Sequence, residues 1–261
     1  PSPILALIPP STPLVIARKF PGNAEGAQSE LIALALQAAV KEGKNVVRLK
    51  QGDPFVYGRG GEEVLAFRKA GVESTVVPGI SSSLAGPALL GMAVTQRGAA
   101  DSMILCTGVG RGGKKVTLPG YERARSLVLL MGVARLQAVV DILTKPAEGI
   151  IKQGTESDRG GAAFPPYLPI AVVERASSAD QRVIASTLDG IVSAIEQVGE
   201  QRPPGMIIIG WSVLALEGAG DTSTLDDADS VADAMAGGVL SKEQGEEELK
   251  GKDLARVARW L

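Results

Sequence analysis

The sequence predicts an α/β fold in which short strands alternate with helices around an aliphatic core. Short β-branched or leucine-rich runs alternate with stretches that repeat apolar residues at helical spacing, and this order favours parallel strands joined by helical crossovers. Hydrophobic residues make up 45% of the 261 residues but aromatic ones only 3%, so Leu, Val, Ile and Ala must form the core. The 32 glycines suit tight loops that approach ligands.

The first part of the chain is expected to hold four strands and three helices. The strands are predicted at Leu14–Ala17, Asn45–Leu49, Ser74–Val77 and Ser102–Cys106, and the helices at Ala27–Glu42, Glu62–Ala70 and Ser81–Leu90. In the first helix Leu31 and Ala35 share an apolar face, and Gly43 ends it. Gly71 closes the second helix, and Ser81 is available as the N-cap of the third.

The second part is expected to form another α/β lobe. Thr107–Tyr121 is rich in glycine, basic residues and proline, which predicts a hinge between an N-terminal lobe (1–115) and a C-terminal lobe (116–216). Strands are predicted at Leu127–Met131, Ile170–Val173 and Met206–Ile209, and helices at Ala134–Leu143 and Leu188–Gln197. Residues 217–261 are acidic and weakly apolar, which predicts a mobile tail ending in a helix over Leu254–Leu261.

Composition excludes several kinds of chemistry. The chain has no histidine, which rules out a Ser-His-Asp triad and a His-ligated metal. One cysteine, Cys106, forms neither an intrachain disulfide nor a multi-cysteine zinc site. A net charge of −2 argues against nucleic-acid binding. No run approaches the ~18 apolar residues of a membrane span, and we expect neither a metal nor a membrane partner.

Two glycine-rich segments invite different interpretations. Gly108–Lys115 fits both a phosphate loop and a dinucleotide fingerprint, but Lys115 replaces the magnesium-binding hydroxyl and no helix start follows; we favour a solvated hinge. Lys50–Glu63 leaves the carboxyl end of a predicted strand, where open α/β sheets bind ligands. There Asp53 either contacts a ligand or caps a turn, and the choice stays open. Pro78–Ser83 is a second strand-to-helix loop in which capping is the default.

These segments resemble a known family. VVRLKQGDPFVYGRGGEE at 46–63, VVPGISS at 76–82, GMAVTQR at 91–97 and TGV at 107–109 resemble the signatures of the uroporphyrinogen-III C-methyltransferases, within the tetrapyrrole methylases. ARKFPGNAEGAQ at 17–28 and VVERASSADQRV at 172–183 resemble the fungal branch, which serves siroheme synthesis. The resemblance runs from about Pro3 to Trp211. It implies two α/β lobes, with a mainly parallel sheet in the first, a mixed sheet in the second and S-adenosylmethionine in the cleft between them.

The resemblance also implies an activity and site residues. The activity is methyl transfer to C2 and C7 of uroporphyrinogen III, giving precorrin-2 and S-adenosylhomocysteine, in the cytoplasm, by a homodimer that supports methionine biosynthesis. The implied cofactor contacts are Gln51, Gly52, Asp53, Val56, Ser81, Ser82, Met131 and Ala176. Lys19 is a candidate proton donor or substrate contact. Arg18, Arg59 and Arg97 are candidates for the substrate's carboxylates, since guanidinium pairs with them, although a surface salt bridge is the simpler role for each.

The chain also departs from the family pattern. The family's opening GxGPG cofactor loop and its YDxLVS segment have no counterpart, so we expect truncation at the start, weak cofactor binding and slow or no turnover. Micromolar affinity for S-adenosylhomocysteine would contradict this. Gln51 replaces a family glycine, and Gln96 and Val109 replace two family histidines. Two alternatives stay open: a methylase of a later precorrin or a diphthine precursor, and a non-catalytic module whose acidic tail binds a partner.

Overall fold

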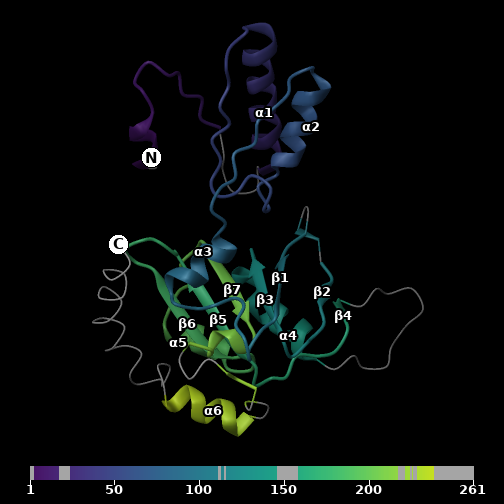
Figure 1. The fold of residues 1–261 in the computed structure, drawn as a ribbon, viewed down its shortest axis with the longest axis vertical. Helices are drawn as coiled ribbons and strands as arrows, with labels where there is room; N and C mark the ends of the chain where they lie inside the picture. Colours follow the sequence, from purple (N-terminus) through teal and green to yellow (C-terminus); the bar gives the residue numbers. More distant parts are fainter. Residues whose placement is uncertain are drawn as a thin grey trace, which may run out of the picture. The chain divides into compact units, whose positions relative to one another are not determined.

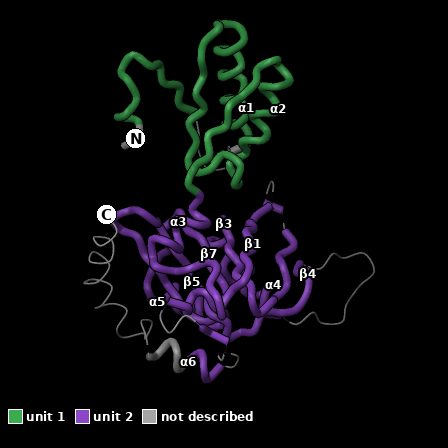
Figure 2. Tube along the Cα trace, in the orientation of Figure 1, with its two compact units in different colours: residues 1–80 green, residues 81–261 purple. Residues whose placement is uncertain are grey.

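The computed structural model describes residues 3–17, 24–110, 113–114, 116–145, 158–216, 221–223, 225 and 228–237. The chain divides into two compact units, residues 1–80 and 81–261 (Figure 2). All strands of the described residues belong to the second unit. The contacts within the chain divide it after Ile80. The lobe boundary expected near residue 115 stays a prediction.

Two helices form the framework of the first unit (Figure 1). A 3-10 turn, η1 (Pro3–Leu7), precedes them. α1 (Ala24–Leu36) continues into a π-helical turn over Gln37–Lys41, which matches the helix expected to end at Glu42. α2 (Gly60–Lys69) carries two glutamates in its first turn and two basic residues in its last. These charges oppose the helix dipole at both ends and stabilise the helix that the sequence predicts there.

The segments expected to be strands in the first unit are extended but unpaired. Residues 14–17, 45–49 and 74–77 belong to no strand in the described part of the chain. Most of their apolar side chains are exposed, and Val47 is 87% exposed. β-branched residues predict extended backbone, but a ladder also needs a neighbour whose N–H and C=O groups match. The mainly parallel sheet expected in the first lobe is therefore not formed by these residues.

The second unit is built on a five-stranded mixed sheet in the order β1-β3-β7-β5-β6. The strands are β1 (Ser102–Thr107), β3 (Arg125–Leu130), β5 (Pro169–Glu174), β6 (Arg182–Thr187) and β7 (Gly205–Ile209). β1 and β3 are parallel, and the other pairs are antiparallel. A mixed sheet was expected in the second lobe, but β1 was expected in the first lobe and instead pairs with β3. Four of its strands were expected, whereas β6 was not.

Strand direction decides which loops share an edge of this sheet. β3 and β5 are each antiparallel to β7, so they run the same way as each other and as β1. The carboxyl ends of β1, β3 and β5 therefore lie along one edge, together with the amino end of β7. We call it the carboxyl edge, and ligands bind at such edges in open α/β sheets.

Apolar side chains cover both faces of the sheet. On the strands β3, β5 and β7 alternate residues point to opposite faces, which is the period-two pattern of a buried sheet. One face packs with α4 (Leu136–Thr144) and α5 (Ile191–Gln197), and the other carries a smaller cluster that includes Val128 and Ile208. α3 (Ser82–Leu89) contacts β3 and β7. All three helices lie where the sequence predicts them.

The hinge and the tail differ from simple linkers. β2 (Leu118–Pro119) lies within the expected hinge 107–121 and pairs in parallel with β4 (Arg159–Gly160), so a strand follows residues 108–115, where a phosphate loop needs a helix. Within the expected tail, Thr222 and Val231 are buried, and α6 (Ala228–Gly237) forms there. Part of the tail thus packs with the second unit. The helix expected over 254–261 lies outside the described residues.

No helix among the described residues is long and apolar enough to cross a membrane.

Candidate functional site

Glycine backbone brings two predicted ligand loops of the first unit into contact. A Cβ on Gly79 would lie 2.7 Å from the carbonyl oxygen of Gly52, and a Cβ on Gly52 would lie 3.2 Å from that of Ile80. Gly52 also has a φ of +74°, which glycine adopts without strain. The loop Gln51–Arg59, hereafter the GD loop, therefore packs against residues 78–80 at a distance that excludes other side chains.

The Asp53 carboxylate fastens this contact. Its Oδ1 accepts the Phe55 N–H at 2.8 Å, and its Oδ2 accepts the Gly79 N–H at 3.0 Å. The Gly79 bond and then the Phe55 bond lower the pKa of Asp53, because N–H donors favour the charged form. Oδ2 thus joins the GD loop to Gly79, whereas Oδ1 stabilises a turn within the GD loop. A ligand contact of Asp53 stays a proposal.

The second half of the GD loop is tightly folded. Tyr57 and Arg59 have φ values of +53° and +57°, a conformation that costs a non-glycine residue about 1–3 kcal/mol. A Cβ on either Gly58 or Gly60 would lie 2.6 Å from the Pro54 carbonyl oxygen, which accepts the Gly60 N–H at 2.8 Å. Strain of this kind concentrates at ligand-binding loops.

The remaining candidates of the first unit differ in accessibility. Gln51 is exposed and Val56 is half-buried. Arg59 donates two hydrogen bonds to Glu62, at 2.9 and 2.7 Å, and lies 3.1 Å from Glu25. Its guanidinium therefore already has carboxylate partners within the chain. Arg18 and Lys19 lie outside the described residues.

In the second unit the predicted serines begin α3. Ser81 is the N-cap: its Oγ accepts the Ser83 N–H at 3.3 Å and lies 2.7 Å from the Ser83 Oγ. This is the capping role that the sequence gives as the default. Ser82 is exposed, whereas Ser83 is buried. Of the three hydroxyls, that of Ser82 is accessible to a ligand.

Met131 and Ala176 follow β3 and β5, so both lie at the carboxyl edge. Met131 follows β3 directly, has a φ of +58° and is 50% exposed. Ala176 lies two residues after β5, between Arg175 and Ser177, whose φ values are +51° and +67°. The chain therefore leaves both parallel strands through strained turns at the same edge.

α3 packs close to this edge. A Cβ on Gly86 would lie 2.6 Å from the Met206 Sδ, at the start of β7, and 3.9 Å from the Ala176 Cβ. The structure thus brings α3, which begins at Ser82, near Ala176.

A buried ion pair supports the turn after β5. Glu174 is fully buried, and its Oε2 accepts a hydrogen bond from Arg182 Nε at 2.7 Å. Its Oε1 accepts the Arg202 N–H at 2.9 Å. Arg182 also donates to the carbonyl oxygens of Val198 and Glu200, at 3.0 and 2.7 Å. These bonds anchor β5, β6 and the approach to β7 just beneath Ala176.

Arg97 lies elsewhere. It is exposed and precedes β1, near Gly98, whose carbonyl oxygen accepts the Thr222 N–H at 3.3 Å. The amino end of β1 is opposite the carboxyl edge. The structure therefore does not bring Arg97 to Met131 and Ala176.

Sequence reasoning missed two kinds of supporting residue. The left-handed residues carry no local signal because Tyr, Arg, Met and Ser rarely adopt that conformation. The partners of buried Glu63 and Glu174 come from other segments, so their spacing does not indicate a pair. Within the described ranges no three His, Cys, Asp or Glu side chains gather in a way that could hold a metal.

Comparisons with known proteins identify the family of the chain. The sequence profile of the Tetrapyrrole (Corrin/Porphyrin) Methylases matches residues 1–192. The chain is 44% identical to a probable uroporphyrinogen-III C-methyltransferase of Schizosaccharomyces pombe over 81% of its length. It is 36% identical to a uroporphyrinogen-III C-methyltransferase of Methanocaldococcus jannaschii, covering 78% of each chain.

Solved structures point the same way. A uroporphyrin-III C-methyltransferase from Thermus thermophilus, complexed with S-adenyl homocysteine, is 35% identical with a TM-score of 0.51, covering 71% of this chain and 74% of that one. A cobalt precorrin-4 methyltransferase, 24% identical with a TM-score of 0.54, shares the fold, covering 71% of each chain. The expected α/β class is therefore confirmed. The chain spans 39% of the S. pombe relative and 33% of one from Saccharomyces cerevisiae.

Proposed function

The chain belongs to the tetrapyrrole methylase family, and from this premise we propose that it transfers methyl groups from S-adenosylmethionine to uroporphyrinogen III. The relatives named uroporphyrinogen-III C-methyltransferase support this substrate. The proposed positions are C2 and C7, with precorrin-2 and S-adenosylhomocysteine as products.

The contact between the GD loop and residues 78–80 is the observation that carries the proposal. S-adenosylmethionine carries ribose hydroxyls, an adenine and an amino-acid moiety, which need backbone donors and acceptors at close range. Gly52 and Gly79 provide side-chain-free backbone, and Gln51 beside them is exposed. The residues present therefore fit this cofactor.

The proposed cofactor contacts are the residues that the family resemblance implies. In the first unit they are Gln51, Gly52, Asp53 and Val56, where Asp53 acts mainly by holding the loops together. In the second unit they are Ser81, Ser82, Met131 and Ala176, where Ser81 caps α3 and Ser82, Met131 and Ala176 offer the contacts. When bound, the cofactor supplies a sulfonium methyl group.

Positioning is proposed to supply most of the rate acceleration. A pyrrole carbon is electron-rich, so it needs a correctly placed methyl group and modest acid–base help, and the sequence has no imidazole to offer. Lys19 is the proposed proton donor or substrate contact. Arg18 and Arg59 are the proposed partners of substrate carboxylates, and Arg59 must then exchange part of its bonding to Glu62. Arg97 has less support because it lies at the opposite edge of the sheet.

The biological setting remains part of the proposal. A role in siroheme synthesis is supported by relatives named siroheme synthase. A homodimer, a cytoplasmic location and a contribution to methionine biosynthesis follow from the family resemblance alone.

Two measurements test the proposal. Calorimetric titration with S-adenosylhomocysteine should give saturable binding at one ligand per chain. Incubation with S-adenosylmethionine and uroporphyrinogen III should then give precorrin-2 fluorescence and a product that carries two added methyl groups. If the chain binds S-adenosylhomocysteine and methylates a later precorrin but not uroporphyrinogen III, it is a methylase of that precorrin instead. An absence of binding would overturn the proposal.

A further inference from the structure

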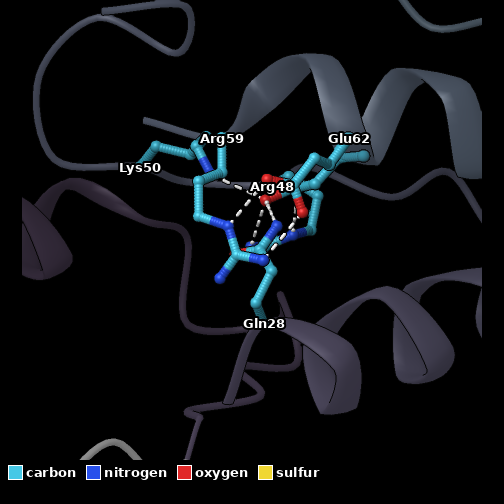
Figure 3. A network of polar contacts seen from close by, with 6 residues as sticks. Gln28, Arg48, Lys50, Arg59 and Glu62 are labelled. Carbon is cyan, nitrogen blue, oxygen red and sulfur yellow. Dashed lines mark hydrogen bonds and ion pairs between the residues drawn. The ribbon is translucent and has the colours of Figure 1, made fainter. Parts of the chain in front are cut away.

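A buried carboxylate at the base of the GD loop has no role in the reaction proposed above. Glu63 lies in the first turn of α2 and is 3% exposed. Its Oε1 accepts hydrogen bonds from Gln28 Nε2 at 2.9 Å, Lys50 Nζ at 2.6 Å and Arg48 Nη2 at 3.1 Å, and its Oε2 accepts one from Arg48 Nε at 2.9 Å. Figure 3 shows this network.

The Lys50–Glu63 ion pair joins the two ends of the loop. Lys50 immediately precedes Gln51, and Glu63 follows Arg59 by one turn of helix. The 2.6 Å contact therefore closes the chain on itself around the whole GD loop. Arg48 and Gln28 fix the Glu63 carboxylate from two further segments, the extended run before the loop and α1.

The charges around Glu63 favour ion pairs that persist in the folded chain. Burial raises the pKa of Glu63, but the bonds from Lys50, Arg48 and Gln28 outweigh it and leave the pKa below its ordinary value. Lys50 and Arg48 are themselves mostly buried, with 15% and 19% of their side chains exposed. A buried carboxylate held by two cations keeps one geometry, because any other leaves a charge desolvated and unpaired.

We propose that Glu63 is a positioning residue that holds the GD loop in its ligand-binding shape through Lys50. The loop needs such a restraint because Tyr57 and Arg59 occupy left-handed conformations that an untethered loop would leave. Glu63 is buried and therefore out of reach of cofactor and substrate. It fixes Lys50 and hence the start of the loop at Gln51 and Gly52. The part of this inference that concerns cofactor affinity rests on the proposed function.

The test replaces Lys50 because Glu63→Gln would leave two cations without an anion and endanger folding. Lys50→Met keeps the aliphatic stem and removes the Lys50–Glu63 ion pair, while Arg48 and Gln28 still donate hydrogen bonds to the Glu63 carboxylate. Lys50→Arg keeps the charge and should preserve the ion pair with Glu63. Lys44→Met is the matched control: Lys44 makes an ion pair of the same 2.6 Å length with Glu42 but is 61% exposed and lies outside the loop.

Two readouts separate positioning from stability. Hydrogen exchange of the loop amides, including that of Gly60, measures local opening of the GD loop and needs no ligand. Calorimetry gives the Kd for S-adenosylhomocysteine at a temperature where all variants are folded. In Lys50→Met we expect loop amides to exchange about tenfold faster and the Kd to rise about tenfold. Lys44→Met should change neither, and Lys50→Arg should restore most of both.

Other results would overturn the inference. Unchanged loop exchange in Lys50→Met would show that the ion pair does not hold the loop. Faster exchange with an unchanged Kd would show that the Lys50–Glu63 ion pair holds the loop but does not position the cofactor site. If the parent chain binds no S-adenosylhomocysteine, the proposed function fails, and the exchange data still decide whether this ion pair holds the loop.

Discussion

Substituting Gly79 by alanine tests the contact on which the proposed cofactor site depends. The added Cβ would lie 2.7 Å from the Gly52 carbonyl oxygen, 2.9 Å from its carbon and 3.1 Å from the Asp53 Cα. The shortest of these is 0.7 Å below the 3.4 Å at which ordinary contact begins. All three atoms are backbone, so no side chain can rotate away. The two loops must therefore separate by several tenths of an ångström.

That separation has two measurable consequences. Overpacking of this kind costs about 1–3 kcal/mol of unfolding free energy. It also stretches the 3.0 Å bond from the Gly79 N–H to Asp53 beyond ordinary hydrogen-bonding length. We expect Gly79→Ala to lower the stability of the first unit by that amount and to weaken S-adenosylhomocysteine binding about tenfold.

The assay is urea denaturation followed by far-UV circular dichroism, together with calorimetric titration of S-adenosylhomocysteine. Gly61→Ala is the matched stability control: nothing lies within 4 Å of its Cβ position, and it lies in α2. Alanine there should raise helix stability by about 0.5–1 kcal/mol. If Gly79→Ala were as stable as the parent and bound the ligand equally well, the argument for glycine-only contact between the loops would be refuted.

Three other predictions follow from the described contacts. Arg182→Met should cost about 3–5 kcal/mol of unfolding free energy, because it leaves buried Glu174 without its cation; urea denaturation measures this. The depressed pKa of Asp53 means that its loop contact is present at neutral pH and is lost as the pH falls through a value below the ordinary 3.8; the midpoint of the Gly79 amide shift in an NMR titration reports it. Burial raises the pKa of Cys106 to about 11, so alkylation at about pH 8 should be slow until the chain is unfolded.

Each of these has a contrasting case. Arg175 and Asp180, whose side chains are 41% and 51% exposed, form an ion pair at 2.7 Å, and Arg175→Met should cost less than about 1 kcal/mol. Equal losses in Arg175→Met and Arg182→Met would contradict the importance of burial. Asp53→Asn should abolish the acid-induced shift of the Gly79 amide, and a shift that persists would assign it to another group. Alkylation of native Cys106 at the rate of a free thiol would contradict its burial.

Helices were more predictable from this sequence than strands because their determinants are local. α2 is signalled by glutamates in its first turn and by Gly71 after its end, all within twelve residues. The strands expected at 45–49 and 74–77 have the right residue types, but a ladder depends on what lies beside them. β6 was missed for the opposite reason, since polar residues interrupt it while β5 supplies its hydrogen bonds along its whole length.

The candidate site was predictable in its loops but not in the roles of its side chains. The signature predicts that Asp53 lies in a ligand loop. Only the structure shows that the N–H of Gly79, 26 residues further on, donates a hydrogen bond to the Asp53 carboxylate. Arg97 is close in sequence to the α3 loop, but the direction of β1 puts it at the other edge of the sheet. Chain direction and long-range hydrogen bonds thus decide which residues of a motif meet.

Backbone strain among the described residues falls in the segments that are proposed to bind the ligand. Among the described residues, the non-glycine residues with positive φ are Tyr57, Arg59, Met131, Arg175 and Ser177. All of them lie in the GD loop or in the turns at the carboxyl edge, although strain played no part in choosing those segments from the sequence. At about 1–3 kcal/mol each, such residues persist only where neighbouring structure holds them. The GD loop has buried Glu63 beside it, and the turn after β5 has buried Glu174. Glu63 is paired with Lys50 and Arg48, Glu174 is paired with Arg182, and each carboxylate is hydrogen-bonded on both oxygens. An ordinary linker would relax without such a restraint, so the coincidence of strain with a buried ion pair favours loops that are preorganised for a ligand.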